Sequence, residues 1–250
     1  LTIALFANSP FNENKFSGFL SYRGKVWQET NRGGIMPITF EKMNFEKYID
    51  HAINYPILFL KKKGKYYSPN GQTFKDFLNG NLNFLEGEKP NLEDFENHLG
   101  TIFTELRLKQ VIEFRSLDTC NFGCICNGPS FFTGLIYGSL DETYEIIKDW
   151  KKEEVMQAYL NAPKQGLNTL LNNKKLIDWG KIFLDLSKKG LEKRNELNKS
   201  EKNETIYLKH IEEIIKNKKT RADMLVDQFN KTKNLNFLIN HDENFSYSGF

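Results

Sequence analysis

The amino-acid sequence predicts an α+β fold, with an antiparallel sheet in the first half of the chain and a mostly helical second half. Segments that read as strands, rich in aromatic and β-branched residues, occur only in the first half. From Ser139 onward nearly every segment places apolar residues at helical spacing. Strands and helices that are segregated along a chain favour α+β over a repeating βαβ arrangement. We predict two regions, 1–138 and 139–250, that pack as one structural unit.

The elements of the first half follow from local periodicity and from turn residues. Apolar spacing predicts helices over 1–6, 16–30 and 45–54. The segment YPILFLKKKGKYYS predicts two strands around a Lys–Gly turn, and TFKDFLNG predicts a short helix that ends at Gly80. The segment LEDFENHLGTIF then predicts a helix, and LRLKQVIEFRSLDT predicts a strand.

The second half is predicted to be helical almost throughout. The expected helices cover 129–138, 140–150, 153–161, 176–199, 204–217 and 220–230. The one at 176–199 places a charged face opposite an apolar face, as a helix packed on a core does. No clear period follows Lys231.

Composition excludes several classes of protein. The chain has 250 residues, 39% of them hydrophobic and 14% aromatic, which is enough for a sizeable core and excludes a disordered chain. Its net charge of +3, from 35 basic and 32 acidic side chains, is too small to predict a nucleic-acid partner. No apolar run approaches the ~20 residues of a membrane span, so we predict no membrane partner. The chain opens on an apolar segment without Met, so we expect it to enter in the middle of a longer protein.

Three cysteines lie within seven residues: Cys120, Cys124 and Cys126. An odd number at this spacing is a poor disulfide framework, so we predict a reducing, cytoplasmic location. Two interpretations stay open, a metal–thiolate site and simple packing or loop thiols, with no fourth soft ligand close in sequence. The role of these cysteines is not determined by the sequence.

The stretch VIEFRSLDT carries the first candidate site. Strand alternation places Glu113 and Arg115 on one face and directs Ile112 and Phe114 toward the core. Spacing alone favours an exposed ion pair of little energetic consequence. The alternative is a rigid mount for a carboxylate and a guanidinium in an active site.

Two further segments carry residues with chemical potential. Arg23 and Trp27 are four apart in a predicted helix, so they line one wall of a pocket or form a snorkelling Arg beside a core Trp. The segment ENHLGTIFTELR contains His98 and Arg107, and a single His on such a helix is more often a structural hydrogen-bonding group than a ligand. No phosphate-binding Gly loop or zinc-protease motif occurs in the chain.

Several blocks match one known family in order along the chain. They are ALFANSPF, GFLSYRGKVWQET, GGIMPITFE, FEKYIDHAINYPILFL, GQTFKDFLNG, DFENHLGTIFTELRLKQVIEFRSLD and PSFFTGLIYG. Together they resemble the second half of the glutamate–cysteine ligases of plants and many proteobacteria. The resemblance is strongest over about the first 140 residues, and the helical remainder is similar mostly in pattern.

The resemblance implies a fold, an activity and a set of site residues. The implied fold is part of a glutamine-synthetase-like scaffold. The implied activity joins the γ-carboxylate of glutamate to the amine of cysteine, with ATP and Mg²⁺, through γ-glutamyl phosphate. Glu113 matches a metal ligand, Arg115 matches an arginine that contacts the transferred phosphate, and Arg23 matches a second active-site arginine. Trp27 and the Asn8–Ser9 turn are expected to shape the same cavity.

Departures from the family pattern set the alternatives. The loop TCNFGCICNG is neutral where the family has basic residues, and no N-terminal half with further metal-binding glutamates precedes Leu1. We therefore expect the isolated chain to be inactive, and we expect that missing half, or a second copy of the chain, as a partner. Two alternatives remain, a related ligase with another amine acceptor and a non-catalytic scaffold.

Overall fold

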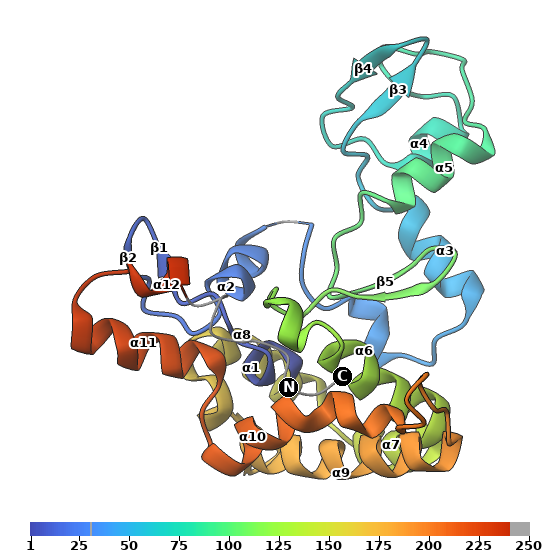
Figure 1. Cartoon of the computed structure of the whole chain (residues 1–250). Coiled ribbons are helices and arrows are strands. Elements are labelled where there is room, and N and C mark those ends of the chain that lie inside the picture. The colour runs from blue at the N-terminus through green and yellow to red at the C-terminus, as the bar shows by residue number, and fades with distance from the viewer. Residues whose placement is uncertain (31, 241–250) are drawn as a thin grey trace. The chain divides into compact units, whose positions relative to one another are not determined.

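The computed structural model describes residues 1–30 and 32–240, and it is α+β, as predicted (Figure 1). Its contacts form two units: Leu1–Val26 with the chain from Leu117 onward, and Trp27–Ser116. The predicted boundary after residue 138 falls inside the first unit, because α1 (Thr2–Leu5) packs against helices of the second half. The last ten residues of the predicted helical region lie outside the described residues. Within the described residues, no helix is long and apolar enough to cross a membrane.

The first unit is mainly helical. Its α-helices after α1 are α6 (Asn127–Thr133), α7 (Leu140–Ile147), α8 (Lys152–Gln165), α9 (Leu176–Arg194), α10 (Lys209–Asn217), α11 (Arg221–Thr232) and α12 (Phe237–Asn240). A π-helical turn, η3 (Gly134–Gly138), follows α6, and 3₁₀ turns form η2 (Phe122–Cys124), η4 (Gly166–Asn168) and η5 (Glu204–Leu208). Two hairpins complete it, β1 (Phe11–Asn12) with β2 (Lys15–Phe16) and β7 (Leu170–Leu171) with β8 (Lys174–Lys175).

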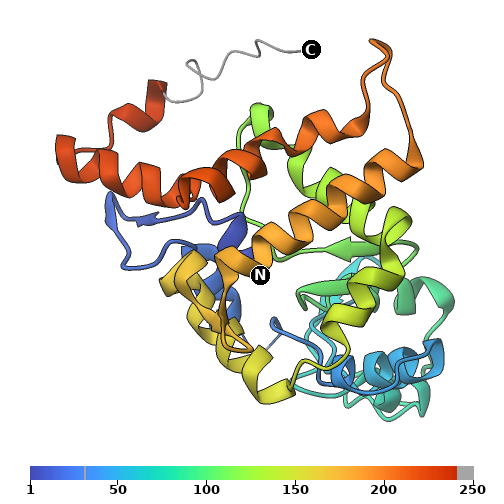
Figure 2. The ribbon, with the colours of Figure 1, turned by 90° about the horizontal axis from the view of Figure 1, so that it is seen from below.

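The core of the first unit surrounds α9, the long orange helix of Figure 2, which buries Trp179, Phe183 and Leu184. Segment η3 packs closely against α9, because Gly134 and Gly190 have no side chain between their backbones. A Cβ atom added to Gly134 would meet the carbonyl oxygen of Ser187 in α9. One added to Gly190 would meet the carbonyl oxygen of Gly134 in η3. Small residues at this crossing therefore determine how closely the two segments approach.

The second unit holds the other elements. They are η1 (Pro37–Phe40), α3 (Phe45–Ile53), β3 (Leu60–Lys62), β4 (Lys65–Tyr67), α4 (Phe74–Leu78), α5 (Leu92–Leu99), β5 (Leu106–Leu108) and β6 (Ile112–Phe114). Helix α2 (Tyr22–Glu29) begins in the first unit and ends in the second. A small core of Ile57, Leu60, Phe74, Phe77 and Leu82 supports the second unit. Helices α4 and α5 both begin with a capping box, which satisfies their first N–H groups.

Three predicted elements differ in the structure. The helix expected from residue 16 begins at Tyr22, because Lys15 and Phe16 pair with β1 and Gly18 turns the chain with φ +85°. The strand expected across LRLKQVIEFRSLDT is a hairpin, β5 with β6. Hairpin β7–β8 lies in the second half, where no strand was predicted, between the helices expected at 153–161 and 176–199.

The reason for the last difference is local, since Asn172 and Asn173 take positive φ values of 49° and 58° and form a tight turn. Each sheet among the described residues has two strands. The antiparallel sheet predicted for the first half is therefore present, among these residues, as separate two-stranded hairpins.

Candidate functional site

The hairpin β5–β6 brings three charged side chains together in the second unit. Arg107 lies directly opposite Glu113 in the antiparallel register, so their side chains share one face. Arg107 donates from Nε and Nη2 to Glu113 Oε2, at 2.9 and 2.6 Å. Arg115 donates from Nη1 to Glu113 Oε1, at 2.7 Å. One carboxylate thus holds two guanidinium groups, and Glu113 and Arg115 lie on the same side, as strand alternation predicts.

This cluster is more buried than an ordinary surface ion pair. The side chains of Arg107 and Arg115 are 13% and 16% exposed, and that of Glu113 is 38% exposed. Burial raises the pKa of the Glu113 carboxyl, but the hydrogen bonds and charges of Arg107 and Arg115 outweigh it, so that the pKa is lowered overall. Glu113 is therefore ionised at neutral pH, and the three groups together carry one net positive charge.

Aromatic rings flank the two guanidinium groups. The Arg115 guanidinium lies 5.6 Å from the Trp27 ring centroid and 5.3 Å from that of Phe103. Arg107 lies 5.9 Å from the same Phe103 ring, and the rings of Trp27 and Phe103 are 5.5 Å apart. Such contacts restrict the side-chain rotamers of both arginines.

The apolar side of β6 does not face a core, contrary to the prediction. Ile112 is 53% exposed and its neighbour Val111 is 68% exposed, whereas Phe114 is half-buried. A two-stranded hairpin has no second layer of its own to cover the residues near its turn. The alternation was read correctly, but the burial inferred from it was wrong for Ile112.

The arrangement around Glu113 bears on its expected role as a metal ligand. A carboxylate offers about four acceptor positions, and the two arginines use three of them. The adjacent guanidinium groups also repel a divalent cation. Among the described residues, no group of three or more His, Cys, Asp or Glu side chains could hold a metal ion. These residues do not fit a magnesium site by themselves, whereas a guanidinium group such as that of Arg115 is suited to a phosphate or carboxylate.

In the first unit, Asp118 connects segments that are distant in sequence. Its Oδ2 accepts hydrogen bonds from the Asn8 backbone N–H at 2.8 Å and from the Ser9 hydroxyl at 2.7 Å. Its Oδ1 accepts one from the Ser21 hydroxyl at 2.8 Å. The Asn8 side chain also donates to the carbonyl of Thr119 at 2.9 Å. The Asn8–Ser9 turn is thereby fixed on the chain segment that follows Arg115 and Ser116.

The same two serines, Ser9 and Ser21, also accept hydrogen bonds from backbone N–H groups of helix α2. Ser9 Oγ accepts from the Arg23 backbone N–H, and Ser21 Oγ accepts from the Gly24 backbone N–H, both at 3.1 Å. The structure thus brings Asn8, Ser9 and the Arg23 backbone together in the first unit, and Glu113, Arg115 and Trp27 in the second. The expectation that Arg23 shares a ligand with Glu113 and Arg115 concerns both units and stays a prediction.

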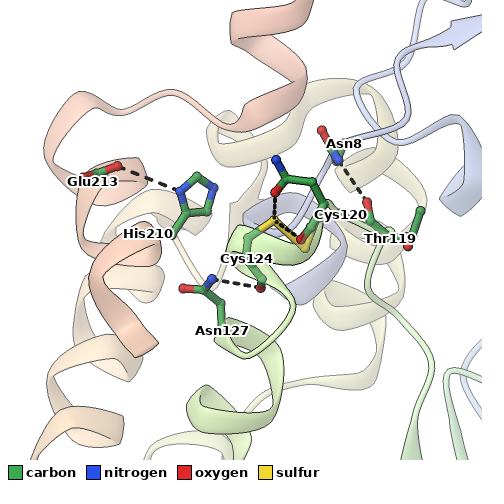
Figure 3. The surroundings of a disulfide bond; sticks show 8 residues. Asn8, Thr119, Cys120, Cys124, Asn127, His210 and Glu213 are labelled. Carbon is green, nitrogen blue, oxygen red and sulfur yellow. Dashed lines mark hydrogen bonds and ion pairs between the residues drawn. A yellow bond between two sulfur atoms is a disulfide. The ribbon is translucent and has the colours of Figure 1, made fainter. Parts of the chain in front are cut away.

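The cysteine-rich loop contains a disulfide, which the sequence interpretation did not expect (Figure 3). Turn η2 brings the Cα atoms of Cys120 and Cys124 to 6.1 Å, so a four-residue separation suffices for the bond. Cys126 remains a free thiol. Both earlier interpretations, a metal–thiolate site and packing thiols, are therefore wrong for the bonded pair.

A cavity of about 20 Å³ lies beside this disulfide and has room for one water molecule. Its polar lining includes Asn8, Asn127 and His210 (Figure 3). The Oδ1 atoms of both asparagines are buried, without a hydrogen-bond partner among the described residues. Burial lowers the pKa of His210, the charge of Arg221 lowers it further, and Glu213 opposes the change. His210 is therefore a neutral group at this wall.

Sequence reasoning missed three residues of these clusters, Phe103, Asp118 and Ser21, and it named Arg107 without its partner Glu113. Arg107 was visible only as part of a helix-like segment, and the hairpin register is what places it opposite Glu113. His98 is buried, bonds the Ala52 carbonyl and stacks on Phe74, which confirms the structural interpretation.

Curated proteins similar to this chain carry one activity in their names. Chloroplastic glutamate–cysteine ligases of Solanum lycopersicum and Arabidopsis thaliana are 38% and 37% identical to it over 234 and 235 residues. The one of Nicotiana tabacum is 36% identical over 234 residues. Each match covers 92% of this chain but only 44% of the relative, so the chain spans less than half the length of these relatives.

The names of these relatives also correct one prediction. All three are chloroplastic proteins, which overturns the cytoplasmic location inferred from the cysteines. The sequence pattern of Glutamate-cysteine ligase family 2 (GCS2) matches residues 1–241, nearly the whole chain. That range includes the segments that carry the Arg107–Glu113–Arg115 cluster and the Asp118 contacts. The chain belongs to the glutamate–cysteine ligase family 2.

Proposed function

We propose that this chain is part of an enzyme that joins the γ-carboxylate of glutamate to the amine of cysteine, with ATP, through γ-glutamyl phosphate. One observation carries the proposal: in a member of this family, Glu113 holds Arg107 and Arg115 as a half-buried, net positive cluster on a short hairpin. We also propose that the hairpin belongs to a glutamine-synthetase-like scaffold that the rest of the longer protein completes.

The chemistry supports these residue roles. Phosphoryl transfer develops charge on equatorial oxygens, and arginines stabilise that charge through paired N–H donors. Arg115 supplies such donors, and the Trp27 and Phe103 rings restrict its movement. Arg107 holds Glu113 in place, because its N–H groups are bonded to Glu113 and to the Gly100 carbonyl. In the first unit, Arg23 supplies a second cation and the Asn8–Ser9 turn supplies polar contacts. Mg²⁺, when bound with ATP, would neutralise phosphate charge, and Glu113 contributes to its site only with carboxylates from outside this chain.

Partners of the chain follow from its length. Since it spans about 44% of its relatives, we propose that the remaining part of such a protein supplies the other metal ligands and the nucleotide contacts. The isolated chain is then inactive. A second copy of the chain is the alternative partner, and sedimentation of the isolated chain distinguishes a dimer from a monomer.

The test uses the gene product that carries this chain. ADP release is measured with glutamate and a panel of amines, with cysteine expected to give the highest kcat/KM. Arg115→Ala is expected to lower kcat/KM by about 10²–10³-fold, the loss typical of one donor to a developing oxyanion. Glu145→Gln is the control and should keep full activity, because Glu145 forms an exposed ion pair with Lys148. If another amine gives a higher kcat/KM than cysteine, the proposed acceptor is wrong and that amine replaces it.

A non-catalytic scaffold makes a different set of predictions. It gives no ADP release with any amine in the panel. Calorimetry with a γ-glutamyl phosphate mimic then separates a retained binding pocket from its absence. If the mimic binds equally well before and after Arg115→Ala, the assignment of this arginine to the phosphate is wrong.

A further inference from the structure

Asp118 is a buried carboxylate of the first unit that joins several segments of the chain. It is 8% exposed, and both of its oxygens accept hydrogen bonds from residues about a hundred positions earlier. These three donors are neutral: the Asn8 N–H and the hydroxyls of Ser9 and Ser21. A buried carboxylate held by neutral donors is costly, so the contacts it organises are specific ones.

The two hydroxyls act as links between Asp118 and helix α2. Each serine donates its hydroxyl hydrogen to the carboxylate, and its oxygen accepts a backbone N–H from the first turn of α2. First-turn N–H groups have no partner within their own helix and need an acceptor. The carboxylate charge also lies near the positive end of that helix, where a negative charge is stabilising. Asp118 thus caps α2 through two serines.

We propose that Asp118 is a positioning residue, which acts through Ser9 and Ser21 to fix the turn that carries Asn8 and the backbone from which Arg23 projects. The proposal rests on the proposed function for its catalytic consequence, but its geometric part stands on the contacts alone. Asp118 itself contacts no reacting group. Its effect on turnover comes from the placement of Arg23 and Asn8.

Asp118→Asn is the sharpest perturbation because it keeps the size of the side chain. One carboxylate oxygen becomes an NH₂ group, which cannot accept a hydrogen bond. If it replaces Oδ2, the bonds from the Asn8 N–H and the Ser9 hydroxyl are lost, and if it replaces Oδ1, the bond from the Ser21 hydroxyl is lost. We expect kcat to fall by about 10–100-fold, as displacements near 1 Å at a reacting centre do. The KM values for glutamate and ATP should change by less than about threefold, because the loss lies in the transition state.

The serines test the route of the effect. In a Ser9→Ala and Ser21→Ala background, Asp118→Asn should add less than about twofold, because the links are already removed. Asp223→Asn is the matched control, since Asp223 accepts bonds from Thr220 N–H and Oγ1 at the start of α11. It removes a comparable cap elsewhere and should leave kcat unchanged.

A second measurement does not depend on turnover. Amide hydrogen exchange, read by NMR at residue resolution, should be faster at Arg23 and Gly24 in Asp118→Asn than in the natural protein, and unchanged in Asp223→Asn. If the natural protein shows no ligase activity, the proposed function fails, while this exchange result still decides the positioning role. Natural kcat in Asp118→Asn, or unchanged exchange at both amides, would overturn the proposal.

Discussion

Replacing Glu113 with glutamine tests the central cluster of the second unit. The change keeps the shape of the side chain and removes the charge that joins Arg107 to Arg115. Three charge-assisted hydrogen bonds are weakened, and two guanidinium groups on one hairpin lose the anion between them. We therefore expect Glu113→Gln to lower both the stability of the hairpin and the affinity of any anion site that depends on its geometry.

The magnitude follows from the exposure of the groups. Hydrogen bonds to charged groups contribute about 1.5–3 kcal/mol each when buried, and exposed ion pairs about 0.2–1 kcal/mol. Because the Glu113 side chain is 38% exposed, its contacts belong near the lower range. Allowing for repulsion between the two arginines, we expect a loss of roughly 2 kcal/mol. For a chain of this size that corresponds to a fall in Tm of about 4–8 °C.

Differential scanning fluorimetry and urea unfolding, followed by tryptophan fluorescence, provide the measurement. Glu145→Gln is the control, since its ion pair with Lys148 is exposed and should contribute little. The folded-state pKa of Glu113 is lowered, so its contribution is present above the unfolded pKa of about 4.3 and is lost as pH falls further. The difference between the variant and the natural chain should therefore vanish in acid. Equal Tm values for Glu113→Gln and the natural chain at pH 7 would refute the reasoning.

Two further predictions concern stability. Burial lowers the pKa of His98, the hydrogen bond to the Ala52 carbonyl partly opposes this, and the charge of Arg32 lowers the pKa further. The folded state therefore resists protonation of His98. Stability should fall as pH drops below about 6.5, and His98→Phe should reduce that slope in a pH series of Tm values; an equal slope would contradict it. Gly190→Ala should lower Tm, because overpacking against the Gly134 carbonyl costs about 1–3 kcal/mol and exceeds the helix-propensity gain of roughly 1 kcal/mol. Gly180→Ala, which meets only the flexible end of Ile215, should be milder, and a larger loss there would exclude this explanation.

Most helices could be predicted because their signals are local. The helix at 45–54 and the hairpin around Lys63 and Gly64 depend on residues within a few positions of one another. Helix α5 likewise begins directly after its N-cap residue Asn91, whose side chain accepts the N–H of Asp94. Its start is therefore determined by residues three apart.

Errors occurred where a distant contact decides the local structure. Whether Lys15 and Phe16 are helix or strand depends on their pairing with β1, and the burial of Ile112 depends on layers that the hairpin lacks. Alternation and periodicity report which side chains share a face. They do not report what covers that face.

The candidate site divides in the same way. The sequence by itself determined that Glu113 and Arg115 share a face, and the order of its blocks predicted the family. Only the tertiary structure placed Arg107 on Glu113, and joined Asp118 to the Asn8–Ser9 turn and the start of α2. The physical reason is that a hydrogen bond requires atoms within about 3 Å, and for residues a hundred positions apart only the folded backbone establishes that distance.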